Sequence, residues 1–277
     1  MKFIDFHDHI YPDKIARKAT QSVIDFYSLT PDDPDITATS SVLLEEGGQA
    51  GISEYVILTV ANRPDQVHSI NEFAVRMKNS YPQFHCMGTL HAAYNRLIEE
   101  VDFIHEKGLM GIKLHPDTQQ FHLDDPRLFP VYDYCQGRIP FIIHCGDYRY
   151  DYSHPRRLRH VLDLFPHLEV IGAHLGGWSI FREGPRYLGD KDCFVDISSC
   201  SEFIPSEEVV RYIRMYGAER CLFGTDFPLW DPREAVDRFL KLPLTDHEKE
   251  LIAHENAEKL LARWDPPEKR GTETVTE

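Results

Sequence analysis

The sequence lacks any long run of apolar residues. No stretch of the 277 residues approaches the ~18 consecutive apolar side chains that a membrane-spanning helix needs. Basic residues are also scarce, because 30 lysines and arginines stand against 45 aspartates and glutamates, which gives a formal net charge of −15. Non-specific binding to nucleic acid depends on a surplus of basic side chains. We therefore expect a small-molecule substrate, and neither a nucleic acid nor a membrane as partner.

Closely spaced cysteine pairs are absent as well. None of the six cysteines forms a C-x-x-C motif, and four of them lie in apolar runs that indicate buried strands. Metal and redox sites built from cysteine generally use close pairs. The first residues, Met1–His7, are too short and too acidic for a secretory signal. We expect reduced thiols, a mature chain that starts at Met1 and a cytoplasmic location, and we leave a homo-oligomer open.

Eight short apolar segments recur along the chain. From the second onward they follow one another at about 30 residues, the spacing of a βαβ unit. They are Lys2–His7, Tyr55–Val60, Phe84–Leu90, Met110–Leu114, Pro140–His144, Leu168–His174, Cys193–Ile197 and Arg220–Thr225. Most are almost continuously hydrophobic, which is typical of parallel strands buried on both faces. Segments with apolar residues at helical spacing separate them. The pattern predicts the α/β class and, within it, a (β/α)8 TIM barrel.

The domain boundaries follow from the same reading. We predict one barrel domain over residues 1–265, including a terminal helix at about Asp246–Arg263, and then a frayed polar tail, 266–277. The proline-bearing stretch Thr30–Asp35 reads as a loop that joins two helices beside the mouth of the active site.

Histidines gather at the predicted carboxyl ends of the strands. Six of the 15 histidines stand there, namely His7, His9, His91, His115, His144 and His174. In TIM barrels the active site is built at this end. Histidines with purely structural roles would show no such preference, so their placement predicts a common site.

A metal site is the chemistry that these ends favour. His7 and His9 are two residues apart, a spacing that points both side chains of a strand to one face. His144 and Asp226 end buried strands, where an unpaired imidazole or carboxylate is costly and a divalent cation offsets the cost. We predict one divalent ion held by His7, His9, His144 and Asp226. These donors suit zinc, manganese or iron and do not choose among them; we name zinc first, with manganese or iron as alternatives.

The combination of motifs resembles the amidohydrolase superfamily, and within it the amidohydrolase-2 branch that includes aminocarboxymuconate-semialdehyde decarboxylase. The residues that carry the resemblance are Asp5–His9, Gly111–Pro116, Ile143–His144, Gly172–Gly177, Phe223–Pro228 and Asn256–Leu261. The resemblance implies a barrel with one metal on the four predicted ligands and with His174 beside the metal-bound water. The phosphoesterases of the PHP class also begin with H-x-H, but they typically close with D-x-H, whereas here the closing motif is Asp226-Phe227-Pro228.

Roles for the remaining site residues follow from this ligand set. A catalytic divalent ion lowers the pKa of bound water and polarises a carbonyl group. Asp226 can accept a proton from the water, and His174 is predicted to be the second acid/base, with a metal ligand or a structural histidine as its alternatives. Lys113 and His115 are predicted to contact substrate. Lys113 occupies the position of the carboxylated, metal-bridging lysine of binuclear amidohydrolases, which is its alternative role.

Three functions remain open on this reading. The first is metal-dependent hydrolysis of a C–N or C–O bond in a small substrate that can carry a carboxylate, and we favour it. The second is metal-dependent, non-oxidative decarboxylation of an unsaturated or aromatic acid. The third is binding without turnover, which the complete set of predicted ligands and His174 disfavours.

Overall fold

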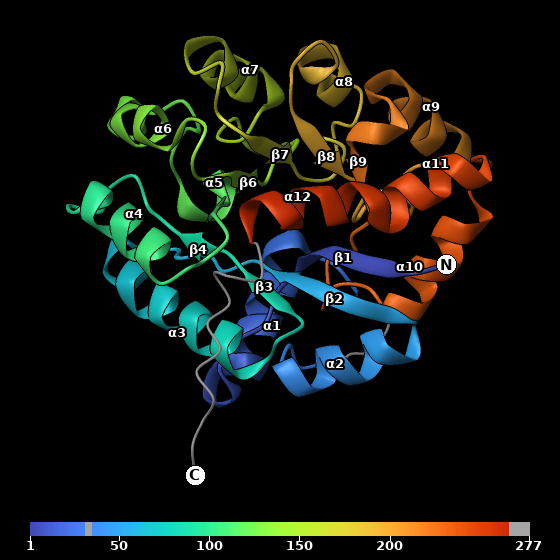
Figure 1. Ribbon diagram of the computed structural model, residues 1–277, viewed down its shortest axis with the longest axis horizontal. Helices are drawn as coiled ribbons and strands as arrows, with labels where there is room; N and C mark the ends of the chain where they lie inside the picture. Colours follow the sequence, from blue (N-terminus) through green and yellow to red (C-terminus); the bar gives the residue numbers. More distant parts are fainter. Residues whose placement is uncertain (31–34, 266–277) are drawn as a thin grey trace.

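The computed structural model describes residues 1–30 and 35–265 of the chain. They form a barrel of parallel strands with helices around its outside (Figure 1). The centre of the predicted Thr30–Asp35 loop and the predicted frayed tail, 266–277, lie outside the described residues.

The strands follow one another around the barrel in chain order, and every pair is parallel. They are β1 (Phe3–Asp8), β2 (Ile52–Ile57), β3 (Phe84–Cys86), β4 (Gly88–Thr89), β5 (Ile112–Leu114), β6 (Phe141–Ile143), β7 (Val170–Gly172), β8 (Phe194–Asp196) and β9 (Cys221–Leu222). The run predicted as one strand, Phe84–Leu90, is divided between β3 and β4 at Met87. The amide of Phe6 donates to the carbonyl of Phe223 at 2.9 Å, which closes the barrel between β9 and β1. The predicted (β/α)8 barrel is confirmed.

Helices connect the strands and cover the barrel from outside. They are α1 (Asp13–Tyr27), α2 (Ser40–Gln49), α3 (Val67–Ser80), α4 (Leu97–Glu106), α5 (Pro116–Gln119), α6 (Phe129–Cys135), α7 (Pro155–Leu164), α8 (Glu183–Leu188), α9 (Ser206–Tyr216), α10 (Pro232–Lys241), α11 (Asp246–Glu250) and α12 (Asn256–Trp264). The predicted terminal helix is thus two helices joined by a π-helical turn, Leu251–Glu255. Thr245 begins it with a capping box shared with Glu248. No helix among the described residues has the length and apolarity that a membrane crossing requires.

The last helix closes one end of the barrel. Inward-facing side chains of the strands form a cluster with one face of α12, made of Ile4, Phe6, Val56, Leu58, Met87, Met110, Ile142, Ile171, Leu222, Ala257, Leu260, Leu261 and Trp264. Lys2, just before β1, forms an ion pair with Glu258 at 3.1 Å, and the indole of Trp264 donates to Glu169, just before β7. These contacts place α12 at the amino end of the barrel, where it crosses the strands in Figure 1. The carboxyl end is left for the site.

All six cysteines are free and buried. The absence of close cysteine pairs in the sequence predicted this outcome. Burial raises the pKa of the Cys200 thiol well above its usual range, so the thiol stays protonated and unreactive.

Candidate metal centre

The predicted metal and acid/base residues meet at the carboxyl end of the barrel. They line one cavity of about 510 Å³, together with Tyr27 and apolar side chains of α1 and with apolar side chains from several loops; the five residues are His7, His9, His144, His174 and Asp226. All five come from strand ends or from the loops that follow them. The structure therefore brings together every side chain that the sequence assigned to the metal and to proton transfer.

A shift in the register of β1 sets the direction of the His7 side chain. The pairing of β1 with β2 changes between Asp5 and Asp8, and Phe6 and His7 both face the barrel interior although they are neighbours in sequence. A bulge of this kind is a common way to redirect a side chain beside an active site. Gly224 makes room for the result, since a Cβ at this position would lie 2.9 Å from the Cβ of His7.

Each ring of the first pair is fixed through its Nδ1 atom. Nδ1 of His7 lies 2.9 Å from Oδ2 of Asp196, and Nδ1 of His9 lies 2.9 Å from the carbonyl oxygen of Leu58. A carboxylate or a carbonyl oxygen accepts only, so Nδ1 carries the proton in both rings. The lone pair is then on Nε2 in both rings, 3.6 Å from Oδ1 of Asp226 in His7 and 3.7 Å from it in His9.

The second pair of histidines is fixed in a similar way. Nδ1 of His174 lies 3.0 Å from the carbonyl oxygen of Ser198, and Nε2 of His144 lies 3.0 Å from that of Gly146. These nitrogens carry the protons, so the lone pairs are on Nε2 of His174 and Nδ1 of His144. The two lone-pair atoms face each other at 3.1 Å. In neutral rings this contact is repulsive unless a proton or a cation lies close to both.

Asp226 supplies the negative charge. Its Oδ1 lies 3.6 Å from Nε2 of His7 and 3.7 Å from Nε2 of His9, while its Oδ2 accepts a hydrogen bond from the hydroxyl of Ser199. The backbone holds Asp226 and His174 at φ angles of 62° and 58°, which non-glycine residues rarely adopt. Strained backbone of this kind is typical of functional sites.

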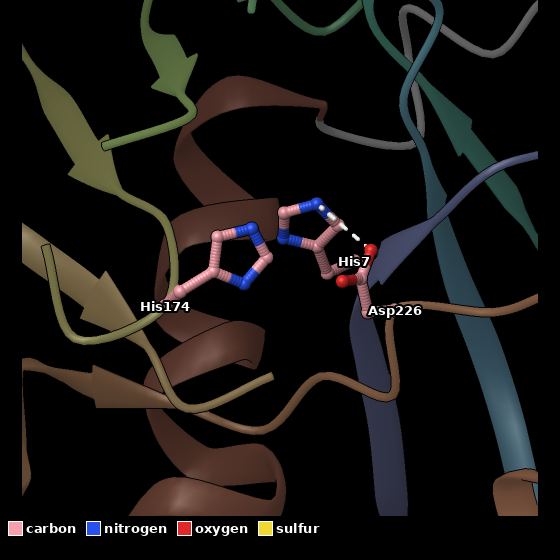
Figure 2. A group of neighbouring side chains, drawn as sticks. All are labelled: His7, His174 and Asp226. Atoms are coloured by element: carbon pink, nitrogen blue, oxygen red, sulfur yellow. Dashed lines mark ion pairs between the residues drawn. The ribbon is translucent and has the colours of Figure 1, made fainter. Parts of the chain in front are cut away.

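The donor set fits a divalent cation. Figure 2 shows His7 between His174 and Asp226, and these three residues bring one ligand atom each to within 4.8 Å of one another. The rings of His7 and His174 are 4.7 Å apart. Lone pairs from neutral imidazoles beside a carboxylate oxygen are the ligands that zinc, manganese and iron take in proteins.

Burial keeps the imidazoles neutral. Burial lowers the pKa of His9 and that of His174 to about 4 each, although nearby carboxylates oppose the change. Burial also lowers the pKa of His7 and of His144 well below the usual range, helped by Lys113 for the first and by His115 for the second. Neutral rings keep the lone pairs that a metal needs.

Lys113 lies beneath the cavity. Its side chain is fully buried, and its Nζ atom is 3.4 Å from Nε2 of His7. Burial lowers its pKa to about 8, while Asp196 and Asp226 act in the opposite direction. Lys113 is not among the described residues that line the cavity. Its predicted contact with substrate stays a prediction.

His115 lines the cavity, but both of its nitrogens make internal contacts. Nε2 lies 2.6 Å from the hydroxyl of Tyr27, and Nδ1 accepts the amide of Thr118 at 3.4 Å. The ring stacks on that of His144 at 3.9 Å. His115, Asp117 and His144 also place donor atoms within 4.8 Å of one another. The predicted contact of His115 with substrate stays a prediction as well.

His91, one of the six histidines at the predicted strand ends, and Arg149, in the loop after β6, have structural partners. Nε2 of His91 lies 3.1 Å from the carbonyl oxygen of Gln119, and His91 is not among the described residues that line the cavity. Arg149 forms a bidentate pair with Asp147.

Several supporting residues were not assigned from the sequence. Ser198 hydrogen-bonds to Asp196 and His174, and Ser199 holds Asp226. Asp196, at the end of β8, accepts the backbone amides of His174 and Ser198 at 3.1 Å each. Its bond to His7 gives it a further role at the metal centre. The pair Ser198-Ser199 after a strand end was the available signal for these hydroxyls.

Solved structures share the fold over nearly the full chain. A TIM-barrel protein of uncharacterised function from Bordetella bronchiseptica is 25% identical, with a TM-score of 0.78 over 95% of this chain and 99% of its own. A dihydroxybenzoic acid decarboxylase from Polaromonas sp. JS666, with bound manganese and the inhibitor 2-nitroresorcinol, is 15% identical, with a TM-score of 0.71 over 94% and 96%. A proposed amidohydrolase from Staphylococcus aureus is 17% identical, with a TM-score of 0.70 over 95% and 100%. No curated protein matches the sequence significantly.

The fold and the site define a TIM barrel with a set of metal-ligand side chains at the carboxyl ends of its strands. A sequence model described as amidohydrolase, that of the amidohydrolase-2 branch, matches residues 84–263, which is 180 of the 277 residues. The chain belongs to this family of metal-dependent enzymes.

Proposed function

We propose that the protein is a metal-dependent hydrolase that cleaves a C–N or C–O bond of a small substrate, which can carry a carboxylate. The observation that carries this proposal is that two of the four predicted ligands, His9 and Asp226, are more exposed to the cavity than the other two. The side chains of His9 and Asp226 are 14% and 8% exposed, whereas those of His7 and His144 are 1% and 3% exposed. The side of the donor set formed by His9 and Asp226 is therefore the one open to the cavity, and a hydrolase must admit one water molecule in every turnover.

His7, His9, His144 and Asp226 would hold one divalent ion, with zinc as the proposed metal and manganese or iron as alternatives. When bound, the ion would lower the pKa of a water molecule and polarise the scissile carbonyl group. His174 lies beside this set through its 3.1 Å contact with His144. We assign it to proton transfer rather than to the ligands.

The residues of the chain then account for the protons. Oδ1 of Asp226 accepts a proton from the attacking water as the new C–O bond forms. The lone pair on Nε2 of His174 takes over this proton from Asp226 and delivers it to the leaving nitrogen or oxygen as the old bond breaks, while its Nδ1 stays bonded to Ser198. Both residues thereby return to their starting protonation states. One water molecule is consumed, and its second hydrogen remains on the acid product. Acid/base groups placed in this way contribute about 10²–10⁴-fold to a rate.

Decarboxylation is the second candidate, because the walls of the cavity are partly aromatic. Tyr11, Phe26 and Tyr27 line it, and flat rings pack well on such side chains. The same donor set would serve this reaction, in which CO₂ leaves and the product carbon takes a proton. A fold shared with decarboxylases at about 15% identity does not decide between the two reactions.

Reactions run in ¹⁸O-labelled water separate the two candidates. Zinc- and manganese-reconstituted protein is incubated with a panel of small lactones, esters and amides, and separately with 2,6-dihydroxybenzoate. Hydrolysis should place one ¹⁸O atom in each acid product, and Asp226→Asn should abolish the reaction. Release of CO₂ from the dihydroxybenzoate, with no cleavage of any panel compound, would contradict the proposal and favour the carboxy-lyase.

A further inference from the structure

Tyr27 brings a hydroxyl group from α1 into the metal centre. Its side chain lines the cavity together with His144, His174 and Asp226, and also a small adjoining void that these residues share. The sequence gave no role to this residue, because α1 lies in the long connection between the first two strands.

The hydrogen bond between Tyr27 and His115 has a defined direction. Nδ1 of His115 accepts the amide of Thr118 at the start of α5, so it must present a lone pair. The proton of the neutral ring is therefore on Nε2, which lies 2.6 Å from the phenolic oxygen of Tyr27. The histidine donates and the tyrosine accepts.

This direction leaves the phenolic proton without a partner. Within the described part of the chain, His115 is the one hydrogen-bonding partner of the Tyr27 hydroxyl. A phenol that accepts through its oxygen can still donate its own proton. That proton is available to a molecule bound in the cavity.

The packing of the ring holds the hydroxyl in place. The Tyr27 ring lies edge-on to Trp178 at 4.8 Å, and the guanidinium of Arg149 lies 5.6 Å from the ring centre. Arg149 is itself fixed, because it pairs with Asp147 and donates to the backbone carbonyl of Phe26. A donor that is fixed before substrate binds costs little reorganisation.

We propose that the hydroxyl of Tyr27 donates a hydrogen bond to an oxygen atom of the substrate. This makes Tyr27 a catalytic residue supplied by α1, and His115 a positioning residue that acts through it. The inference rests on the proposed function in one respect, since it assumes that a metal-held, oxygen-bearing ligand occupies the cavity.

Two probes of different chemistry test the proposal on the zinc-loaded protein. Benzohydroxamate offers oxygen atoms to the metal and to a nearby donor, whereas imidazole binds metal and has no oxygen. Calorimetry should give a Kd for benzohydroxamate that is about tenfold higher in Tyr27→Phe than in the parent, from the loss of one hydrogen bond. The Kd of imidazole and the metal content should not change. Tyr134→Phe, which removes a hydroxyl bonded to Asp102 outside the cavity, is the matched control and should match the parent.

The other possible outcomes separate failure of the proposed role of Tyr27 from failure of the proposed function. Equal benzohydroxamate affinity in parent and Tyr27→Phe would overturn the proposed role of Tyr27, and so would an equal weakening of both probes. Neither result would bear on the proposed hydrolase function. Failure of the parent to take up zinc, manganese or iron would instead refute the proposed function, and the inference with it. Nitrogen-15 spectra of the zinc-loaded protein give a second test: His115 should appear with its proton on Nε2, and a proton on Nδ1 would overturn the proposal.

Discussion

Oδ2 of Asp196 lies 2.9 Å from Nδ1 of His7 and fixes which nitrogen of the ring faces the metal centre. The other oxygen of Asp196 accepts the backbone amide of His174 at 3.1 Å and the hydroxyl of Ser198. One buried carboxylate therefore positions both a predicted ligand and the predicted acid/base. Carboxylate–histidine–metal arrangements of this kind set the tautomer and the basicity of the ligand.

Replacing this carboxylate should weaken metal binding without unfolding the protein. Asp196→Asn introduces an N–H group among donors that all need an acceptor, so the His7 ring loses its fixed orientation. We expect zinc affinity to fall by about 10–100-fold, measured by competition with a chelator. Asp102→Asn, which changes a carboxylate on α4 far from the cavity, is the control. Parent-like zinc affinity in Asp196→Asn would show that Asp196 does not orient the ligand.

His174→Ala separates proton transfer from metal binding. On a substrate found in the labelled-water screen, kcat should fall by about 10²–10⁴-fold while metal content stays that of the parent. The metal content decides between two roles, because His174 places a possible ligand atom within 4.8 Å of those of His7 and Asp226. Loss of the metal would make His174 a ligand, and unchanged kcat would remove it from the mechanism. His160→Ala on the surface of α7 should have no effect.

The eight strands were predictable because each is a short, buried, nearly continuous apolar run that needs no tertiary information to recognise. Phe141–Ile143 followed by His144 is an example, since the run predicts both the strand and the polar group at its end. Tyr27 could not be found in this way. Tyr27 reaches the cavity from the end of α1, which Arg149, 122 residues further along the chain, anchors through the carbonyl oxygen of Phe26. The bulge in β1 also leaves no signature in the alternation of residues.

Lys113 should not be a carboxylated bridge between two metals. Its Nζ atom lies 3.4 Å from Nε2 of His7, and the resemblance of the sequence implies a single metal. Adding bicarbonate during reconstitution should leave the metal content and the activity unchanged. Electron density for a carboxylated lysine between two metal ions, in crystals grown with metal and bicarbonate, would refute this prediction.

Glu54 should stabilise the amino end of the barrel in a pH-dependent way. Hydrogen bonds from His85 at 3.0 Å and from Lys2 at 2.9 Å lower its pKa from 4.5 to about 2, despite an opposing effect of burial. A lowered pKa gives stability that is complete above the unfolded value, near 4.5, and is lost as the pH falls towards 2.

Urea unfolding between pH 7 and pH 3 measures this effect. Glu54→Gln should lower the free energy of unfolding by roughly 1 kcal/mol at pH 7, and the difference from the parent should shrink below about pH 4.5. Glu106→Gln, at an exposed position of α4, should have little effect at any pH. A difference between Glu54→Gln and the parent that stays constant down to pH 3 would contradict the assigned pKa.

The metal content of the reconstituted protein tests the central claim most directly. Elemental analysis after reconstitution with zinc, manganese or iron should find close to one ion per chain in the parent. The double variant His7→Ala with His9→Ala should retain little of it, whereas the surface pair His105→Ala with His247→Ala should match the parent. No bound metal in the parent after reconstitution with any of the three metals, or full metal content in His7→Ala with His9→Ala, would contradict the account.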